Sequence, residues 1–270
     1  MKSINLDVIF DILQRGVRRA GTFTGIGLNA SDHSHSLSYE LTIEGPYFIE
    51  FTKPNLSDHD HAHIMQEFAK WIRANGLREL IETFSIYMHE LYTAIYSLLE
   101  HLHQLDDLAK HNPKKFERKG IREQIELLSK VISVSEGDIK IIRSLNGARN
   151  CYAHRRGLIG RQDIGPQSDS FQLIWKGLQI EAEEPDGNIV VESDIFDRVF
   201  ENGADIQFRN LQKEKRLKIG EELLIANRRE FAEIYLCVFE IGKRLHQATI
   251  SFVQEKAALH EKDADRSTTA

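Results

Sequence analysis

Residues 77–111, LRELIETFSIYMHELYTAIYSLLEHLHQLDDLAKH, form the longest periodic stretch of the chain and decide its fold class. Apolar side chains recur every three or four positions from Leu80 to Leu105, which is the spacing of an α-helix. A helix of 35 residues extends about 50 Å, because each residue adds 1.5 Å. Such a length is typical of a helical bundle, and we therefore predict a mainly α fold of about five or six helices, two of them very long.

Further helices are predicted on both sides of this stretch. Residues 3–19 place apolar side chains at helical spacing, whereas the glycine-rich residues 21–36 are typical of a loop. A second helix from Asp58 is expected to end at Asn75-Gly76, a common helix stop. The remaining expectations are helices at 114–133, 135–156 and 227–259, followed by a mobile tail at 260–270.

Two β insertions interrupt the predicted helices. Alternating apolar residues on either side of Glu44-Gly45-Pro46 predict a β-hairpin between the first two helices. Pro185-Asp186-Gly187 predicts a second hairpin within residues 157–226, and another strand pair is expected around Ile219-Gly220. The final helix needs the earlier helices to cover its apolar face, so we interpret residues 1–270 as one domain carrying a β-rich insertion.

Composition and charge narrow the class of protein. Hydrophobic residues make up 41% and charged residues 28% of the 270 residues, ordinary values for a globular protein. No apolar run approaches the roughly 18 residues of a membrane span, and the two cysteines fit a reducing compartment. We therefore expect a cytoplasmic protein. The net charge of −6 excludes a uniformly basic coat for nucleic acid, but it leaves room for a local basic site.

Residues 139–162, IKIIRSLNGARNCYAHRRGLIGRQ, supply such a site. This segment of an acidic protein contains no aspartate or glutamate. A concentration of positive charge of this kind indicates an anionic ligand, and phosphate is the leading candidate. The basic side chains of the segment are Lys140, Arg143, Arg149, Arg155, Arg156 and Arg161.

A helix over this segment separates polar from apolar side chains. Arg143, Asn150 and His154 fall within about 60° of each other at 100° per residue. Gly147 lies among them, where a second backbone could approach closely, and Arg149 sits on the border of this face. The opposite face is expected to pack in the core through Ile141, Leu145, Ala148 and Tyr152.

These side chains have the chemistry that cleavage of an RNA phosphodiester requires. An imidazole, with an unperturbed pKa near 6.5, can move protons at neutral pH. A guanidinium can hold the phosphate and stabilise the charge of the transition state. The 2′-hydroxyl of RNA supplies the nucleophile, so this reaction needs no metal and does not cut DNA. The same residues also fit a plain solvated helix face.

Arg149-Asn150-Cys151-Tyr152-Ala153-His154 resembles the signature of the HEPN family, which is an arginine, four to six residues and then a histidine, often with a polar residue after the arginine. The resemblance covers the predicted helices within 58–156 and 227–259, but not the first helix or the β insertions. It implies a metal-independent endoribonuclease without a cofactor that works as a homodimer. Many family members are toxins or antiviral defence effectors, some of them restrained by an antitoxin or regulatory protein.

Carried over to this chain, the resemblance makes Arg149, Asn150 and His154 the catalytic residues. Arg149 would bind the scissile phosphate of single-stranded or transfer RNA, His154 would act as acid or base, and Asn150 would assist. Acidic residues from elsewhere, the β insertion among the candidates, are expected to offset the charge. The expected RNA-binding residues are Arg143, Arg155, Arg156 and Arg161.

Other interpretations stay open from the sequence. Some HEPN proteins lack cleavage and act as modules that bind RNA, a nucleotide or a partner protein. His59 and His63 with Glu67 could share a metal, but a solvated first helical turn accounts for them and we predict no metal site. Cys151 is more typical of a small packing residue than of a nucleophile.

Overall fold

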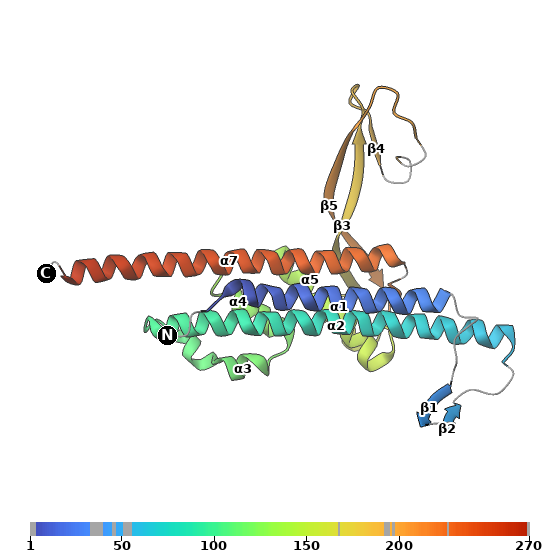
Figure 1. The fold of residues 1–270 in the computed structure, drawn as a ribbon, viewed down its shortest axis with the longest axis horizontal. Helices are drawn as coiled ribbons and strands as arrows, with labels where there is room; N and C mark the ends of the chain where they lie inside the picture. The colour runs from blue at the N-terminus through green and yellow to red at the C-terminus, as the bar shows by residue number, and fades with distance from the viewer. Residues whose placement is uncertain are drawn as a thin grey trace.

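The structure, a computed structural model, describes residues 4–32, 40–44, 47–50, 56–166, 168–191, 195, 198–225 and 227–268. Three long helices run along the molecule, and shorter helices and a β-sheet pack against them (Figure 1). In chain order the elements are α1 (Leu6–Asp32), β1 (Glu40–Glu44), β2 (Tyr47–Glu50), α2 (Asp58–His101), η2 (Asp106–His111), α3 (Pro113–Glu117), α4 (Ile121–Leu128), α5 (Glu136–Arg155), η3 (Arg161–Asp163), β3 (Phe171–Glu183), β4 (Ile189–Val191), β5 (Asp205–Leu217) and α7 (Arg228–Thr268).

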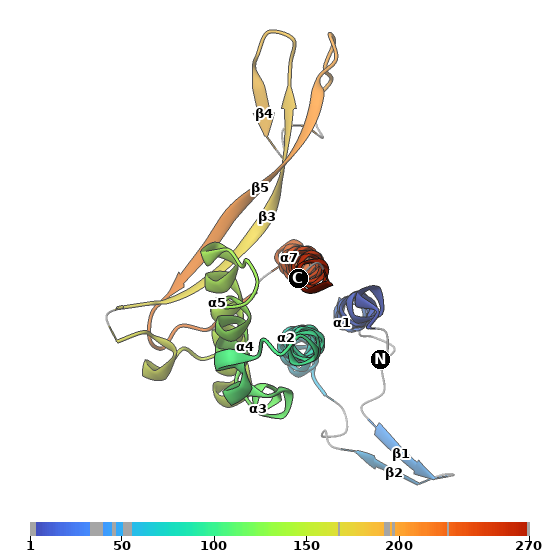
Figure 2. The same cartoon turned by 90° about the vertical axis from the view of Figure 1, so that its left-hand side faces the viewer.

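The predicted mainly α fold is confirmed, with α2 of 44 residues at its centre and α7 of 41 residues beside it. Buried side chains leave α2 in different directions: Tyr87 and Tyr92 are both inaccessible to solvent and lie about 140° apart around the helix. Tyr87 contacts α7, whereas Tyr92 stacks on Phe116 of α3. A helix that is apolar on several sides has to be covered on several sides. Figure 2 shows how: α1 and α7 lie on one side of α2, and α4 and α5 lie on the other.

At two positions a glycine, by lacking a side chain, lets the three long helices approach one another closely. A Cβ atom at Gly242 of α7 would lie 2.1 Å from Leu13 Cδ2 of α1, and Tyr87 of α2 donates its hydroxyl proton to the Gly242 carbonyl at 2.8 Å. At a second contact, Gly76 of α2 lies under the hydrogen bond of 2.9 Å that joins the Thr24 and Tyr235 hydroxyls. Each contact therefore joins α1, α2 and α7.

Two predicted helix boundaries are wrong for this reason. Of the expected loop at 21–36, residues 21–32 are helical, because α1 packs on α2 through Gly27, where a Cβ would lie 2.5 Å from Ile72 Cδ1. Residues 33–36 lie outside the described residues. The expected stop at Asn75-Gly76 is an uninterrupted part of α2. Gly27 and Gly76 serve close packing, whereas the sequence pattern assigned them to a loop and a helix stop.

The helix predicted over residues 77–111 also ends earlier than expected. α2 stops at His101, and His103 takes a left-handed conformation with a φ of 56°. Residues 106–111 then form a 3-10 helix, in place of the expected continuation to 111. The single helix predicted at 114–133 is instead two short ones, α3 and α4.

Both β insertions are present. β1 and β2 pair antiparallel, while Gly45 and Pro46 of their predicted turn lie outside the described residues. β3 pairs with β4 across the predicted Pro185-Asp186-Gly187 turn and with β5 along its whole length. The strand pair expected around Ile219-Gly220 is wrong, because β5 ends at Leu217 and its partner is β3.

The sheet is anchored at its base and projects at its tip. Trp175 of β3 donates its indole N–H to the buried Glu233 of α7 at 2.9 Å, and Lys213 of β5 pairs with the same carboxylate at 2.8 Å. The far half of β3 and β5 extends away from the helices with β4 (Figures 1 and 2). α7 continues as a helix to Thr268, through most of the tail predicted at 260–270.

Replacing Gly76 by alanine should destabilise the protein. The new methyl group would meet Thr24 Oγ1 at 2.2 Å and the Tyr235 hydroxyl at 2.9 Å, and overpacking of this kind costs about 1–3 kcal/mol. The measurement is the free energy of unfolding in urea. Gly25→Ala on α1 is the matched control, because nothing lies within 4 Å of its Cβ position and an alanine in a helix is favoured by about 0.5–1 kcal/mol. Equal effects of the two substitutions would contradict the packing described.

Candidate functional site

The basic segment forms α5 and its C-terminal turn. The Ser135 hydroxyl caps the helix by accepting the backbone N–H of Asp138 at 3.1 Å. Arg156, with a φ of 52°, and Gly157, with a φ of 87°, then turn the chain out of the helix. The predicted core face is confirmed: Ile141, Leu145 and Ala148 are inaccessible to solvent, and Tyr152 packs against the core.

Asp138 fixes the start of α5 to two other elements. Its buried carboxylate accepts two hydrogen bonds from Arg244 of α7, at 2.8 and 2.9 Å, and pairs with Lys176 of β3 at 3.3 Å. Burial alone would raise the pKa of this carboxyl, but Arg244, Ser135 and Lys176 together hold the pKa below its ordinary value. α5 is therefore held in one position relative to α7 and β3.

We expect Asp138→Asn to lower the free energy of unfolding by about 2 kcal/mol near neutral pH, because it removes a buried charge whose partners stay behind. A carboxyl with a depressed pKa stabilises the folded state above its unfolded pKa of about 3.9, and this contribution disappears as the pH falls through the folded pKa. The difference between wild type and variant should thus shrink below about pH 4.

Urea unfolding at several pH values measures this difference. Glu136→Gln is the control, because Glu136 is exposed and makes no hydrogen bond or ion pair with any described residue. A difference that persists unchanged at low pH would contradict the role of Asp138.

Arg149 lies between α5 and α2. Its Nη1 donates to the Asn150 amide oxygen at 3.0 Å, and its Nη2 donates to Glu82 Oε1 of α2 at 3.2 Å. The side chain is 29% exposed. The structure thus brings together two of the three predicted catalytic residues, and it adds Glu82, which the sequence pattern did not reveal because it is 67 positions away.

His154 is exposed and makes no hydrogen bond or ion pair within the part of the chain that the structure describes. It follows Asn150 by one helical turn, so these two residues leave α5 about 40° apart. Arg149 precedes His154 by five positions, which places them about 140° apart around the helix. Asn150 and His154 therefore share a face. Arg149 lies beside that face and contacts it by its hydrogen bond to Asn150.

Two of the four predicted RNA-binding arginines are held in ion pairs. Arg143 pairs with Glu126 of α4, and Arg155 pairs with the buried Asp163 of η3. Asp163 lies in the 157–226 insertion, so one offsetting acid comes from there, while Glu82 and Glu126 come from helices. Arg156 and Arg161 are exposed and have no ionic partner among the described residues.

Gly147 does not lie open to a second backbone. A Cβ atom there would be 2.9 Å from Cε2 of Phe171, the first residue of β3. Beside it, the Ser144 hydroxyl exchanges hydrogen bonds of 3.0 Å with the backbone of Ile174. The position at Gly147 where a second backbone, of protein or nucleic acid, was expected to approach is therefore taken by β3 of the same chain. At the end of this face Asn150 is half-buried and His154 is exposed.

Cys151 is buried, and this burial raises the pKa of its thiol to about 11. A thiol in that state is not a nucleophile at neutral pH, so packing accounts for the residue.

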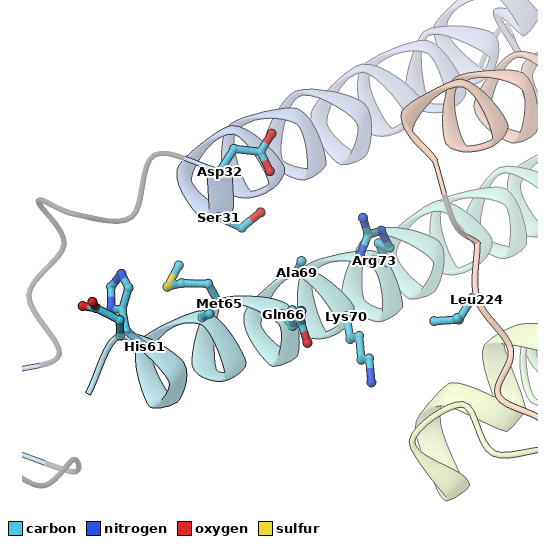
Figure 3. A pocket seen from close by; sticks show the side chains of 11 residues that line it. Ser31, Asp32, His61, Met65, Gln66, Ala69, Lys70, Arg73 and Leu224 are labelled. Atoms are coloured by element: carbon cyan, nitrogen blue, oxygen red, sulfur yellow. The ribbon is translucent and has the colours of Figure 1, made fainter. Parts of the chain in front are cut away.

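A cleft of about 560 Å³ between the end of α1 and the start of α2 contains none of the predicted site residues. Figure 3 shows Ser31 and Asp32 facing it from α1 and His61, Met65 and Arg73 from α2. Lys70 at its edge is paired with Glu222 at 2.9 Å. The cleft is separate from the Asn150–His154 face, and sequence analysis did not single it out.

The residues that the structure describes contain no group of three or more histidine, cysteine, aspartate or glutamate side chains placed to hold a metal ion. Nor does any described helix combine the length and apolar character that crossing a membrane demands.

No family model, curated protein or solved structure matches this chain. The resemblance to HEPN proteins therefore rests on residues 149–154 and their helical setting.

Proposed function

We propose that this protein is a metal-independent endoribonuclease of the HEPN type, with Arg149, Asn150 and His154 as its catalytic residues. The observation that carries the proposal is the accessible, unpartnered imidazole of His154 one turn after Asn150, whose amide oxygen holds the Arg149 guanidinium at 3.0 Å. Arg156 and Arg161 follow directly, exposed and unpaired within the described residues. An imidazole and two guanidinium groups are thus exposed at the C-terminal end of α5 and in the residues that follow it.

The reaction needs no group beyond these. The 2′-oxygen of the RNA attacks phosphorus while its proton passes to a neutral imidazole, and the bond from phosphorus to the 5′-oxygen breaks as that oxygen gains a proton. A guanidinium neutralises the added charge on the phosphate. The products are a 2′,3′-cyclic phosphate and a 5′-hydroxyl end.

A homodimer supplies the geometry that one chain lacks. Arg149 and His154 leave α5 about 140° apart, so we expect the Arg149 guanidinium of one subunit to face the partner's His154 across a shared cleft. Two histidines then allow one imidazole to accept the proton while the other donates one. A cytoplasmic toxin or defence effector, restrained by an antitoxin or regulatory protein, is the biological setting that this activity fits.

The direct test is cleavage of a mixed single-stranded RNA in the presence of EDTA. We expect His154→Ala and Arg149→Ala each to lower the cleavage rate by at least 100-fold, in line with the loss of a proton-transfer group. His260→Ala, which removes an exposed histidine far along α7, is the matched control and should leave the rate unchanged. Single-stranded DNA should stay intact. Equal cleavage by all variants, or none by any protein, would contradict the proposal.

Glu82 should restrain the site. Its carboxylate occupies Arg149 Nη2 in the absence of RNA, so a scissile phosphate has to displace it. We expect Glu82→Gln to strengthen RNA binding several-fold, because it removes a negative charge beside the phosphate position. Glu79→Gln, one turn away on the same helix, is the control. Salt-dependent binding of a DNA analogue of the substrate measures affinity without turnover, and an unchanged or weaker affinity would contradict this role.

A second candidate function is a non-catalytic module that binds RNA or a partner protein. The ion pairs of Arg143, Arg149 and Arg155 favour it, because side chains already paired within the chain are less available to a substrate. RNA binding that depends on salt, without cleavage by the wild type, would select this function.

A further inference from the structure

A second hollow lies where α2 ends, away from the α5 site. It has a volume of about 520 Å³ and lies between η2, α4 and α7. Its floor is apolar and includes Leu99, Leu105, Leu127 and Phe252, of which Leu99 and Leu127 are buried. A hollow of this size and lining is typical of a small-molecule site.

The rim of this hollow is basic. Lys110, His111, Lys130 and Lys256 border it, and no carboxylate lines it among the residues whose side chains the structure describes. In a protein with a net charge of −6, such a rim is a local departure from the overall charge. Lys130 and Lys256, which have no ionic partner in the described ranges, place positive charge beside the apolar floor.

The basic rim continues into a neighbouring hollow of about 500 Å³, which shares Lys110 and His111. Lys115, Arg118 and Lys119 border this neighbouring hollow. The one carboxylate described along it, Glu123, is paired with Lys119 at 2.9 Å. The positive region therefore extends beyond the apolar floor on one side.

Two lysines of the rim are available to an anion. Lys130 is exposed, and its ammonium group has no ionic or hydrogen-bond partner in the described ranges. Lys256 donates to the neutral Gln104 amide at 3.1 Å and lies 5.7 Å from the centre of the Phe252 ring. Neither ammonium group meets a carboxylate among the side chains that the structure describes, so both can bind an anionic ligand.

We propose that this hollow binds a single-chain amphiphile with an anionic head group, such as an alkyl phosphate or a fatty acid. The aliphatic floor covers the chain, and Lys130 and Lys256 hold the head group. A bare anion would leave the floor unused. A nucleobase fits less well, because Lys256 already lies over the Phe252 ring on which a base would stack. The Gln104 amide oxygen, which could hydrogen-bond to the edge of a base, already accepts from Lys256. Each buried methylene group should raise the affinity roughly fourfold.

The test is calorimetric titration of the full chain with decyl phosphate below its micelle concentration. We expect decyl phosphate to bind at least tenfold more tightly than inorganic phosphate and than decyl maltoside, which has the same chain without a charge. Sodium decanoate should bind as well, because the rim recognises negative charge and has no geometry specific to phosphate.

Charge reversal at the rim tests the named residues. Lys130→Glu with Lys256→Glu should weaken decyl phosphate binding at least tenfold, and Lys130→Glu alone should weaken it several-fold. Lys243→Glu, at an exposed position earlier on α7, should bind as the wild type does. A thermal melt of each variant verifies that it folds. If the double variant does not fold, Lys130→Glu alone, at an exposed position, tests the proposal.

Several results would overturn the proposal. These are equal binding of inorganic phosphate, equal binding of decyl maltoside, no effect of Lys130→Glu, and binding only to vesicles of anionic phospholipid, which would indicate a membrane surface in place of a free amphiphile. The site uses none of the residues assigned to RNA cleavage, so His154→Ala should bind decyl phosphate normally, and either proposal can fail alone.

Discussion

The structure depends on the need to cover α2 on several sides. Between Leu77 and Leu99 this helix buries side chains toward α1, α7 and the short helices at once. A helix with such a surface is stable in water only inside a bundle. The close approach of α1 and α7 follows from it, and that approach requires a missing side chain at Gly76 and Gly242.

Covering α2 also positions α5. One face of α5 packs against the bundle, while its first turn is tied to α7 and β3 through Asp138 and its border is tied to α2 through Arg149 and Glu82. The basic helix is consequently rigid and largely balanced in charge. The proposed chemistry has to occur at its C-terminal end, where His154 and Arg156 are exposed.

The protein is acidic overall, but its charged side chains are distributed unevenly. Around α5 most guanidinium groups meet carboxylates from other elements, as with Arg143 and Glu126 or Arg155 and Asp163. At the end of α2, in contrast, Lys130 and Lys256 have no such neighbours among the described side chains. Exposed positive charge beside an apolar hollow suits a ligand that carries both an anionic group and an apolar chain, which distinguishes the second region from a solvated helix face.

The mainly helical fold, the Pro185-Asp186-Gly187 hairpin and the buried face of α5 could be predicted from the sequence, because periodic apolar spacing and turn chemistry act over a few residues. The exposed position of His154 at the end of α5 agrees with the same reasoning. The continuation of the helices through Gly27 and Gly76 could not be predicted, since a glycine that breaks a helix and one that admits a neighbouring helix look alike in sequence. The closing of Gly147 by Phe171, the Glu82 contact to Arg149 and the lysine rim around Phe252 join residues far apart in the chain, and only tertiary packing could decide them.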